Sequence, residues 1–337
     1  MLCRILSLIR SPRTVLVIVL SCWNDEGTRA VASNPVPVSA VQSATEGSTV
    51  FESRPIASVQ EAQIALARLG FSSGAIDGIS GAQTDAALRV FQAQLKLPVT
   101  GQLDEATRAR LILSTSPLRE ITLSLEEFKG FGPLATTWMG KSLQTELGYE
   151  SALEWAAEKG HAQPALIRQL NPTVDWDHVL PGARFMVPAV GPRSFPTKAA
   201  RLEVQLESRI IRAYDANDTI MVQFPVSIAR KVEKRPSGEL RVTVVIPNPD
   251  YTFDPAVFPE SDEGRELGRK LRLPPGPNNP VGRAWVGLDW PGYGIHGSPT
   301  PEKVGRTESH GCFRLANWDA LTLIELAWVG LPVVVLQ

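Results

Sequence analysis

The residues best suited to chemistry lie near the C-terminus, where His296-Gly297 is followed by Ser309-His310-Gly311-Cys312-Phe313-Arg314. A free cysteine thiol has a pKa near 8.5, so only about 3% of it is thiolate at pH 7. A cysteine that attacks a carbonyl carbon therefore needs a nearby base, and an imidazole can serve. A loop that returns to its starting point would place His296 beside Cys312, with glycines on both sides to permit close backbone approach. This pattern indicates a cysteine nucleophile and a histidine base.

Other interpretations of the same cluster stay open. Cys312 could be a small buried hydrophobic residue, with each histidine merely hydrogen-bonded in a turn. His296, His310 and Cys312 could bind zinc, although no compact pair of ligands flanks them. Two nearby carboxylates, Asp289 and Glu308, could act as catalytic acids. Three nearby aromatic residues could form the floor of a substrate groove or belong to the core: Trp285, Trp290 and Tyr293. The clustering between glycines favours nucleophilic catalysis.

Strands are the elements expected to position this cluster. Leu202, Val204 and Leu206 alternate with polar residues, and segments 220–224 and 240–245 are apolar and rich in β-branched residues. A helix is expected with Asn317 as its N-cap and Gly330 as its stop, followed by a strand over 332–336. Segment 199–337 is therefore predicted to be a mostly β sandwich or barrel with one helix after the cysteine.

These residues resemble the active-site signature of L,D-transpeptidases, the YkuD-type catalytic domain. The likeness rests on His296-Gly297, Gly305, the run from Ser309 to Arg314, and Asn317 with Asp319-Ala320. The proline-rich segment 274–282 also resembles the segment that precedes the site in many members. The resemblance implies a mixed, mostly β fold and an enzyme that needs neither a metal nor another cofactor.

The resemblance also implies a role for each residue of the signature. Cys312 would be the nucleophile and His296 the base, with the backbone carbonyl of Gly297 orienting the imidazole. The amides of Gly311 and Cys312 would form the oxyanion hole. Two further residues, Ser309 and His310, would shape the substrate pocket. Arg314 would meet a substrate carboxylate through its planar guanidinium.

The implied reaction is a two-step acyl transfer on the tetrapeptide stems of peptidoglycan. Cys312 would attack the carbonyl of the third, L-configured centre, release D-alanine and form a thioester. An amine of a neighbouring stem would then give a crosslink, whereas water would make the enzyme an L,D-carboxypeptidase. A third alternative is a non-catalytic wall-anchoring protein that keeps the scaffold of an enzyme.

A helical module is predicted over residues 58–113. Ser58 and Glu61 begin an amphipathic helix that Gly70 ends, a second helix carries the stripe around Val90 and Phe91, and Asp104 caps a third. The run Asp77-Gly78-Ile79-Ser80-Gly81-Ala82-Gln83-Thr84, with Phe91-Gln92 and Thr100-Gly101, resembles the three-helix peptidoglycan-binding domain of bacterial wall enzymes. A generic helical bundle would need many of the same residues.

The middle segment, residues 118–190, is predicted to contain helices over 151–159 and 164–170 and a strand over 184–187. Asn171-Pro172, Pro181-Gly182 and Val187-Pro188 are similar to the second half of a LysM domain, a small module that binds wall glycan. The first strand of such a module is not evident, so a structural spacer is an equal alternative.

The whole chain of 337 residues is long enough for several domains, and its expected fold class is multidomain α+β. Its 34 basic and 35 acidic residues provide no field that would attract nucleic acid. Residues 1–32 are typical of an export signal, in which Ser21-Cys22 after an apolar run resembles the lipobox of lipoproteins. Cleavage after Ala30-Val31-Ala32 is the rival, and 33–57 would be a tether. We expect a monomer exported to the bacterial envelope, in the periplasm or wall, and lipid-anchored if Cys22 is modified.

Overall fold

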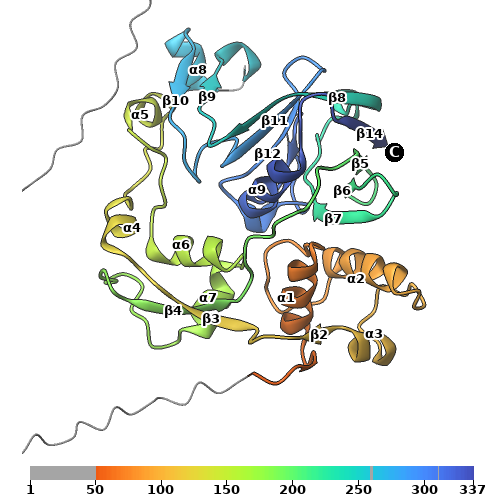
Figure 1. Ribbon diagram of the computed structural model, residues 1–337. Helices are drawn as coiled ribbons and strands as arrows, with labels where there is room; N and C mark the ends of the chain where they lie inside the picture. The colour runs from red at the N-terminus through yellow and green to blue at the C-terminus, as the bar shows by residue number, and fades with distance from the viewer. Residues whose placement is uncertain (1–50, 259–260, 310) are drawn as a thin grey trace, which may run out of the picture. The chain divides into compact units, whose positions relative to one another are not determined.

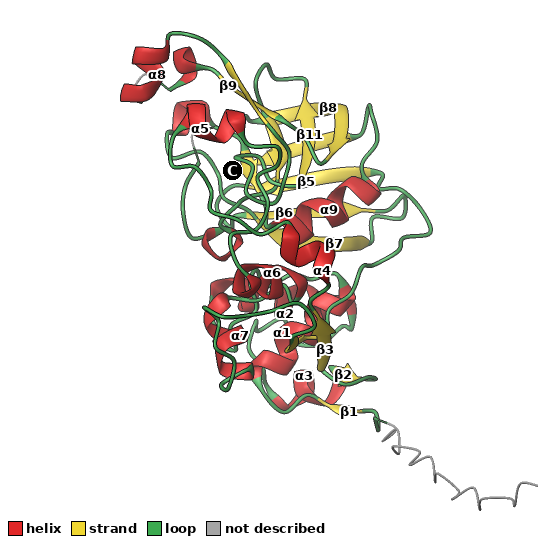
Figure 2. Cartoon of the chain, turned by 90° about the vertical axis from the view of Figure 1, so that its left-hand side faces the viewer, coloured by secondary structure: helices red, strands yellow, loops and turns green. Residues whose placement is uncertain are grey.

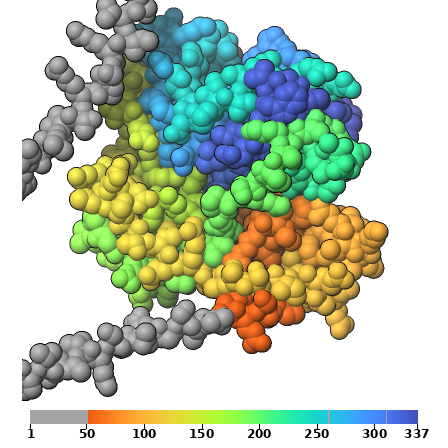
Figure 3. Space-filling model, viewed as in Figure 1, coloured from red at the N-terminus to blue at the C-terminus, as the bar shows by residue number. Residues whose placement is uncertain are grey.

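The computed structural model describes residues 51–258, 261–309 and 311–337. The predicted leader, Cys22 and residues 33–50 of the predicted tether lie outside the described residues. Within the described ranges, no helix is both long and apolar enough to cross a bilayer. We call residues 51–113 the N-terminal module, 118–190 the middle module and 199–337 the C-terminal domain. In Figures 1 and 3 the N-terminal module is orange, the middle module yellow to green, and the C-terminal domain green to blue.

The N-terminal module consists of three helices and a short antiparallel strand pair. These are β1 (Arg54–Pro55), α1 (Val59–Leu69), α2 (Ala82–Gln94), α3 (Glu105–Arg110) and β2 (Ile112–Leu113). As the sequence predicts, Ser58 caps α1, Gly70 ends it in the left-handed conformation, and Asp104 caps α3. Ile56 is buried and β1 pairs with β2, so residues 54–57 belong to this module and not to the tether predicted for them.

The middle module is built around one antiparallel strand pair, β3 (Leu118–Thr122) and β4 (Arg184–Pro188). The helices between them are α4 (Leu125–Lys129), α5 (Trp138–Leu143), α6 (Ala152–Lys159) and α7 (Pro164–Leu170). Sequence analysis predicts α6, α7 and β4 but misses β3, whose polar pattern carries only two half-buried apolar residues, Leu118 and Ile121. The likeness to a LysM domain stays a prediction.

The C-terminal domain contains one curled sheet of eight strands, in the order β13-β12-β11-β8-β14-β5-β6-β7. The strands are β5 (Arg201–Gln205), β6 (Ile210–Tyr214), β7 (Ile220–Pro225), β8 (Gly238–Pro247), β11 (Ala284–Leu288), β12 (Gly294–His296), β13 (Phe313–Arg314) and β14 (Pro332–Leu336). The predicted mostly β fold is thus confirmed, as a curled half-barrel, and helix α9 (Asn317–Leu326) covers its apolar face (Figure 2).

Helix α9 differs at both ends from the sequence prediction. Its N-cap is Ala316, so Asn317 lies in the first turn and its side chain is used elsewhere. The helix ends at Leu326 rather than near Gly330, because Trp328 turns away and donates a hydrogen bond to the Ala199 carbonyl. Leu323 and Leu326 are completely buried against the sheet. Burial of one such side chain contributes about 1.5–3 kcal/mol, which fixes α9 directly behind the strands that carry the functional cluster.

A two-stranded flap extends from the sheet and contacts helix α5 of the middle module. It comprises β9 (Tyr251–Phe253), η2 (Pro255–Val257), α8 (Asp262–Leu267) and β10 (Leu271–Leu273), and β9 pairs with β10 (Figure 1). Trp138 of α5 stacks on Phe253 with ring centroids 4.3 Å apart. The Glu263 carboxylate accepts hydrogen bonds from the amides of Trp138 and Met139, both at 2.8 Å. The middle module thus holds the flap.

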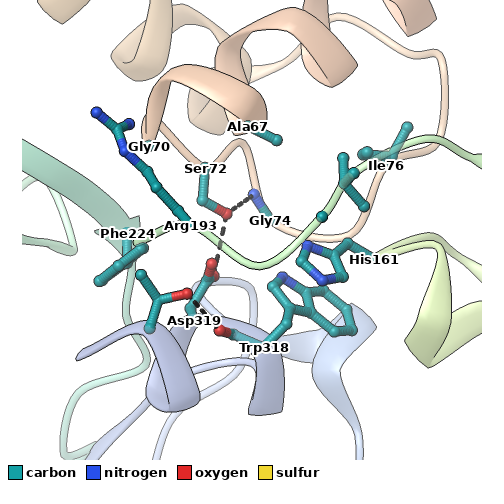
Figure 4. A pocket seen from close by; sticks show the side chains of 13 residues that line it. Ala67, Gly70, Ser72, Gly74, Ile76, His161, Arg193, Phe224, Trp318 and Asp319 are labelled. Carbon is teal, nitrogen blue, oxygen red and sulfur yellow. Dashed lines mark hydrogen bonds between the residues drawn. The ribbon is translucent and has the colours of Figure 1, made fainter. Parts of the chain in front are cut away.

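All three parts contribute side chains to one buried junction (Figure 4). The Ser72 hydroxyl of the N-terminal module lies 3.0 Å from a carboxyl oxygen of Asp319 on α9. The His161 ring of the middle module stacks on Trp318 of α9, with centroids 5.0 Å apart. Burial raises the pKa of Asp319 to about 8 and lowers the pKa of His161 to about 3. Neutral groups are therefore favoured here at pH 7, as expected for a packed interface.

Candidate active site

Two short parallel strands bring the cluster together. In the pair formed by β12 and β13, Ile295 lies opposite Phe313 and His296 lies opposite Arg314. Residues opposite each other in neighbouring strands direct their side chains to the same face, and so do residues two apart in one strand. His296 and Arg314 therefore share a face, and Cys312 immediately precedes β13. All three line the same pocket.

The pocket has a volume of about 680 Å³ and a largely apolar lining. The flap contributes Tyr251, Val257 and Phe258, and the middle module contributes Trp138. The further lining residues are Lys234, Ser261, Pro280, Val281, Trp285, Pro291, Gly292, Tyr293 and Gly311. A cavity of this size and character suits an elongated organic ligand with one polar reacting centre.

The His296 ring is fixed by a stacking contact and a hydrogen bond. It stacks on Trp285, with centroids 5.6 Å apart and planes at 21°. Its Nδ1 lies 2.6 Å from the carbonyl oxygen of Gly297, and the residue is 5% exposed. Because a carbonyl oxygen only accepts, Nδ1 must carry the proton, which leaves Nε2 with a free lone pair. This tautomer is the one that a general base requires.

Comparisons with known protein families match two segments of the chain. Residues 199–335 match the model of the YkuD family, described as the L,D-transpeptidase catalytic domain. Residues 199–335 are therefore a YkuD-type domain. Residues 56–111 match a second model, described as a putative peptidoglycan binding domain, and this segment coincides with the helices of the N-terminal module. Both resemblances inferred from the sequence motifs are thereby confirmed.

Individual relatives align mainly with the YkuD domain. The putative L,D-transpeptidase YkuD of Bacillus licheniformis is 27% identical over 171 residues, which are 51% of this chain and 84% of that protein. The putative L,D-transpeptidase YqjB of Bacillus subtilis is 32% identical over 33% of this chain, which spans only 57% of that relative. A solved L,D-transpeptidase from Mycobacterium smegmatis is 19% identical, with a TM-score of 0.33 over 45% of this chain and 65% of that one.

The electrostatics of the YkuD domain favour a neutral thiol and a neutral imidazole at rest. Burial, with a smaller contribution from the Arg314 charge, lowers the pKa of His296 to about 4. Burial also raises the pKa of the Cys312 thiol, although the Gly294 backbone and Arg314 oppose this shift. A resting thiolate is therefore not favoured at neutral pH. The proton must move to His296 as the sulfur attacks.

The Cys312 thiol is hydrogen-bonded to a backbone carbonyl and not to His296. Cys312 Sγ lies 3.5 Å from the carbonyl oxygen of Gly292, and no hydrogen bond joins it to His296 among the described residues. A rotation about the Cα–Cβ bond of Cys312 is the simplest movement that would change this partner. Contacts between nucleophile and base are often long in ligand-free enzymes and tighten when substrate binds.

Arg314 is the cation of this pocket. Burial lowers its pKa, whereas Cys312 and Tyr251 act in the opposite direction. Its guanidinium has no hydrogen-bonded or ionic partner within the described ranges, although other arginines of the YkuD domain pair with carboxylates. A half-buried, unpaired guanidinium in an apolar pocket is suited to bind a ligand carboxylate with two parallel hydrogen bonds.

Of the other predicted site residues of the YkuD domain, one lines the pocket and one lies outside it. Gly311 lines the pocket, whereas Ser309 is buried outside it and donates a 2.6 Å hydrogen bond to the Cys312 carbonyl. His310 lies outside the described residues, so the zinc alternative is not tested. No group of three histidine, cysteine or acidic residues that could hold a metal occurs in the described part of the chain.

The aromatic and acidic residues near the cluster, whose roles the sequence leaves open, divide into those that line the pocket and those that do not. Trp285 and Tyr293 line the pocket, whereas Trp290 does not and is partly exposed. Asp289 accepts a hydrogen bond from the Arg241 amide, and Glu308 forms ion pairs at 3.5 and 3.7 Å with two arginines. Neither carboxylate lines the pocket, so both are held in structural contacts.

Asn317 supports the His296 loop, a role that sequence analysis misses. Its Oδ1 accepts from the amides of Arg283 and Ser298, each at 3.1 Å, and its Nδ2 donates to the Pro277 carbonyl. A Cβ on Gly297 would lie 2.3 Å from that Oδ1, so only glycine fits where the backbone passes the amide. Asn317 therefore fixes the backbone that carries the Gly297 carbonyl. Its position just after the cysteine motif was the only available signal.

Proposed function

We propose that the protein is an L,D-transpeptidase that acts on tetrapeptide stems of peptidoglycan. The observation that carries the proposal is the shared pocket of Cys312, His296 and Arg314, with the imidazole held in the tautomer of a base. The YkuD family match and the peptidoglycan-binding module both point to peptidoglycan as the substrate. Cys312 is the nucleophile in this proposal, His296 the base and Arg314 the anchor for a substrate carboxylate.

In the first step, the sulfur of Cys312 forms a bond to the carbonyl carbon of the third stem residue while His296 Nε2 takes the thiol proton. The amides of Gly311 and Cys312 would stabilise the oxyanion. The intermediate then expels the amine of D-alanine, which receives the proton from His296, and a thioester remains. The neutral resting pair suits this sequence because His296 must begin unprotonated.

In the second step, an amine of another stem attacks the thioester carbonyl and gives its proton to His296. The carbon–sulfur bond breaks, His296 returns the proton to the sulfur, and the crosslinked product is released. Water in place of the amine would give a trimmed tripeptide. Both acceptors use the same thioester, so the products decide between them. In this proposal the protein acts as a monomer in the bacterial envelope after export, either free or held by a lipid anchor on Cys22.

The acceptor is tested by mass analysis of the products from purified tetrapeptide stems, offered with and without a second stem that carries a free side-chain amine. We expect D-alanine release together with a dimer whose mass equals the two stems less D-alanine. Tripeptide without dimer, even at high acceptor concentration, would establish the carboxypeptidase alternative. No D-alanine release under either condition would support the wall-anchoring alternative.

Replacing Arg314 with alanine tests the carboxylate anchor. A hydrogen bond to a charged group contributes about 1.5–3 kcal/mol, so KM should rise roughly 10- to 100-fold with a smaller change in kcat. A stem whose carboxylates are amidated provides the control, because wild type and variant should then bind it equally poorly. Equal KM values for the unmodified stem would remove Arg314 from substrate binding.

A further inference from the structure

The N-terminal module contacts the loop that joins the proposed base to the proposed nucleophile. We call residues 297–309 the connecting loop; it includes the single turn η3 (Pro301–Lys303). Gln83, in the first turn of α2, donates a 2.8 Å hydrogen bond from its Nε2 to the Val304 carbonyl. Two residues further along the connecting loop, Arg306 donates a 3.1 Å hydrogen bond to the carboxylate of Asp77 in the N-terminal module. The N-terminal module therefore holds the loop that lies between the two proposed catalytic residues.

Asp77 is a rigid anchor for this contact. Its Oδ1 accepts from the Gln63 amide group and from the Ile79 backbone, both at 2.9 Å. Its Oδ2 accepts from Gln163 of the middle module at 3.0 Å as well as from Arg306. The Asp77 side chain is only 8% exposed. An ion pair to a carboxylate that is already fixed on several sides costs little further ordering, unlike a pair of two mobile surface groups.

Gly305 shows how closely the module and the connecting loop approach. Its φ is +73°, and a Cβ built there would lie 2.3 Å from Gln83 Nε2. On its other side, the Gly305 amide donates a 2.9 Å hydrogen bond to the Ser227 hydroxyl. The loop backbone is therefore clamped between helix α2 and the strand-side segment around Ser227.

Ser227 connects this clamp to the strand of the nucleophile. Its amide and carbonyl exchange hydrogen bonds with the backbone of Arg314, at 2.9 and 3.0 Å. Further along the connecting loop, the Ser309 amide donates to the Ile228 carbonyl and the Ser309 hydroxyl donates to the Cys312 carbonyl. A continuous series of hydrogen bonds thus runs from Gln83 through Gly305 and Ser227 to β13.

We propose that Gln83 and Asp77 of the N-terminal module are positioning residues for Cys312. By fixing Val304 and Arg306, they set the path of the connecting loop and hence the place of the thiol relative to His296. The module therefore supports the acyl transfer itself, in addition to any binding of the wall. The inference rests on the proposed function, and the experiment below distinguishes a failure of the inference from a failure of the proposed function.

The matched pair of variants is Gln83→Ala and Gln94→Ala. Gln94 also joins α2 to the C-terminal domain, through a 2.9 Å hydrogen bond from its Nε2 to the Ile220 carbonyl, but it contacts β7 and not the loop. The full chain is assayed on a soluble tetrapeptide stem without glycan, so that wall affinity does not contribute. Small misplacements of reacting groups reduce rates strongly, so kcat of Gln83→Ala should fall roughly tenfold with KM within about twofold. Gln94→Ala should retain the wild-type kcat.

Arg306 supplies a second, milder variant because its side chain is 52% exposed. Arg306→Ala should lower kcat and slow the alkylation of Cys312 by iodoacetamide, and Arg306→Lys should restore part of both. Thermal unfolding is recorded for every variant. Wild-type kcat and alkylation rates in both Gln83→Ala and Arg306→Ala would overturn the inference and leave a merely structural contact. A wild-type chain without D-alanine release would instead overturn the proposed function.

Discussion

Replacing Cys312 with alanine is expected to abolish D-alanine release from tetrapeptide stems. Apart from the proposed base His296, the other described residues that line the pocket offer only hydroxyl, phenol, indole, amine or guanidinium groups without a paired base. Removal of a nucleophile lowers kcat by about 10⁴-fold or more in comparable acyl-transfer enzymes. The measurement is the initial rate of D-alanine release at saturating substrate. Mass analysis of the wild-type protein should also show the thioester-linked tripeptide, which the variant lacks.

Two controls distinguish nucleophilic catalysis from its alternatives. Cys312→Ser keeps the size of the side chain but gives a far weaker nucleophile, so it should be nearly as inactive as alanine while binding substrate normally. A metal chelator should leave the wild-type rate unchanged, whereas a loss of activity would revive the zinc interpretation of His296, His310 and Cys312. Wild-type and Cys312→Ala rates that are equally low would mean that the domain serves to anchor the protein to the wall.

The sequence predicts much of the local structure because local signals determine it. Helix α7 has the predicted bounds, and α1 begins and ends at its predicted caps, Ser58 and Gly70. The parallel pairing of β12 with β13 is also consistent with the short segment between His296 and Cys312. Local signals cannot show which of several possible hydrogen-bond partners a polar side chain will contact in the folded protein. Asn317 is a good N-cap residue by type, yet its amide satisfies three backbone groups of a buried loop instead.

The missed elements depend on contacts between residues far apart in the chain. Strand β3 has a weak pattern of its own and is stabilised by pairing with β4. Trp138 reaches the pocket only because α5 packs on the flap, where Glu263 accepts from the start of that helix. The ionisation of the site likewise depends on tertiary structure. Sequence spacing places a base near a thiol, but burial, which the spacing does not reveal, lowers one pKa and raises the other.

Burial shifts the pH dependence of the site to lower pH than that of an exposed thiol–imidazole pair. The folded pKa of His296 is about 4, below the usual value near 6.5, so the ring stays neutral and able to accept a proton down to about pH 5. In the unfolded chain the ring binds a proton below about pH 6.5, so between these values acid favours unfolding. Activity that depends on His296 should therefore persist below pH 6, and its loss at lower pH should follow a pKa near 4 or unfolding.

Replacing His296 with alanine should slow the alkylation of Cys312 by iodoacetamide about 100-fold near pH 7, in line with the usual contribution of a general base. The pH dependence provides the sharper test. In wild type, His296 takes the thiol proton during attack, so the rate should change little between pH 5.5 and 8. Without the base, only preformed thiolate reacts, and the raised pKa of Cys312 keeps that fraction small. The variant's rate should then rise nearly tenfold per pH unit.

The matched control is His178→Ala. His178 is 82% exposed and ion-paired with Asp175, so its removal changes one imidazole without touching the pocket. It should alkylate at the wild-type rate across the whole range. Parallel pH profiles for wild type and His296→Ala, differing by less than a factor of two near neutrality, would show that the imidazole does not take the thiol proton. Because alkylation needs no peptidoglycan substrate, that result would exclude His296 as the base even if D-alanine release continued.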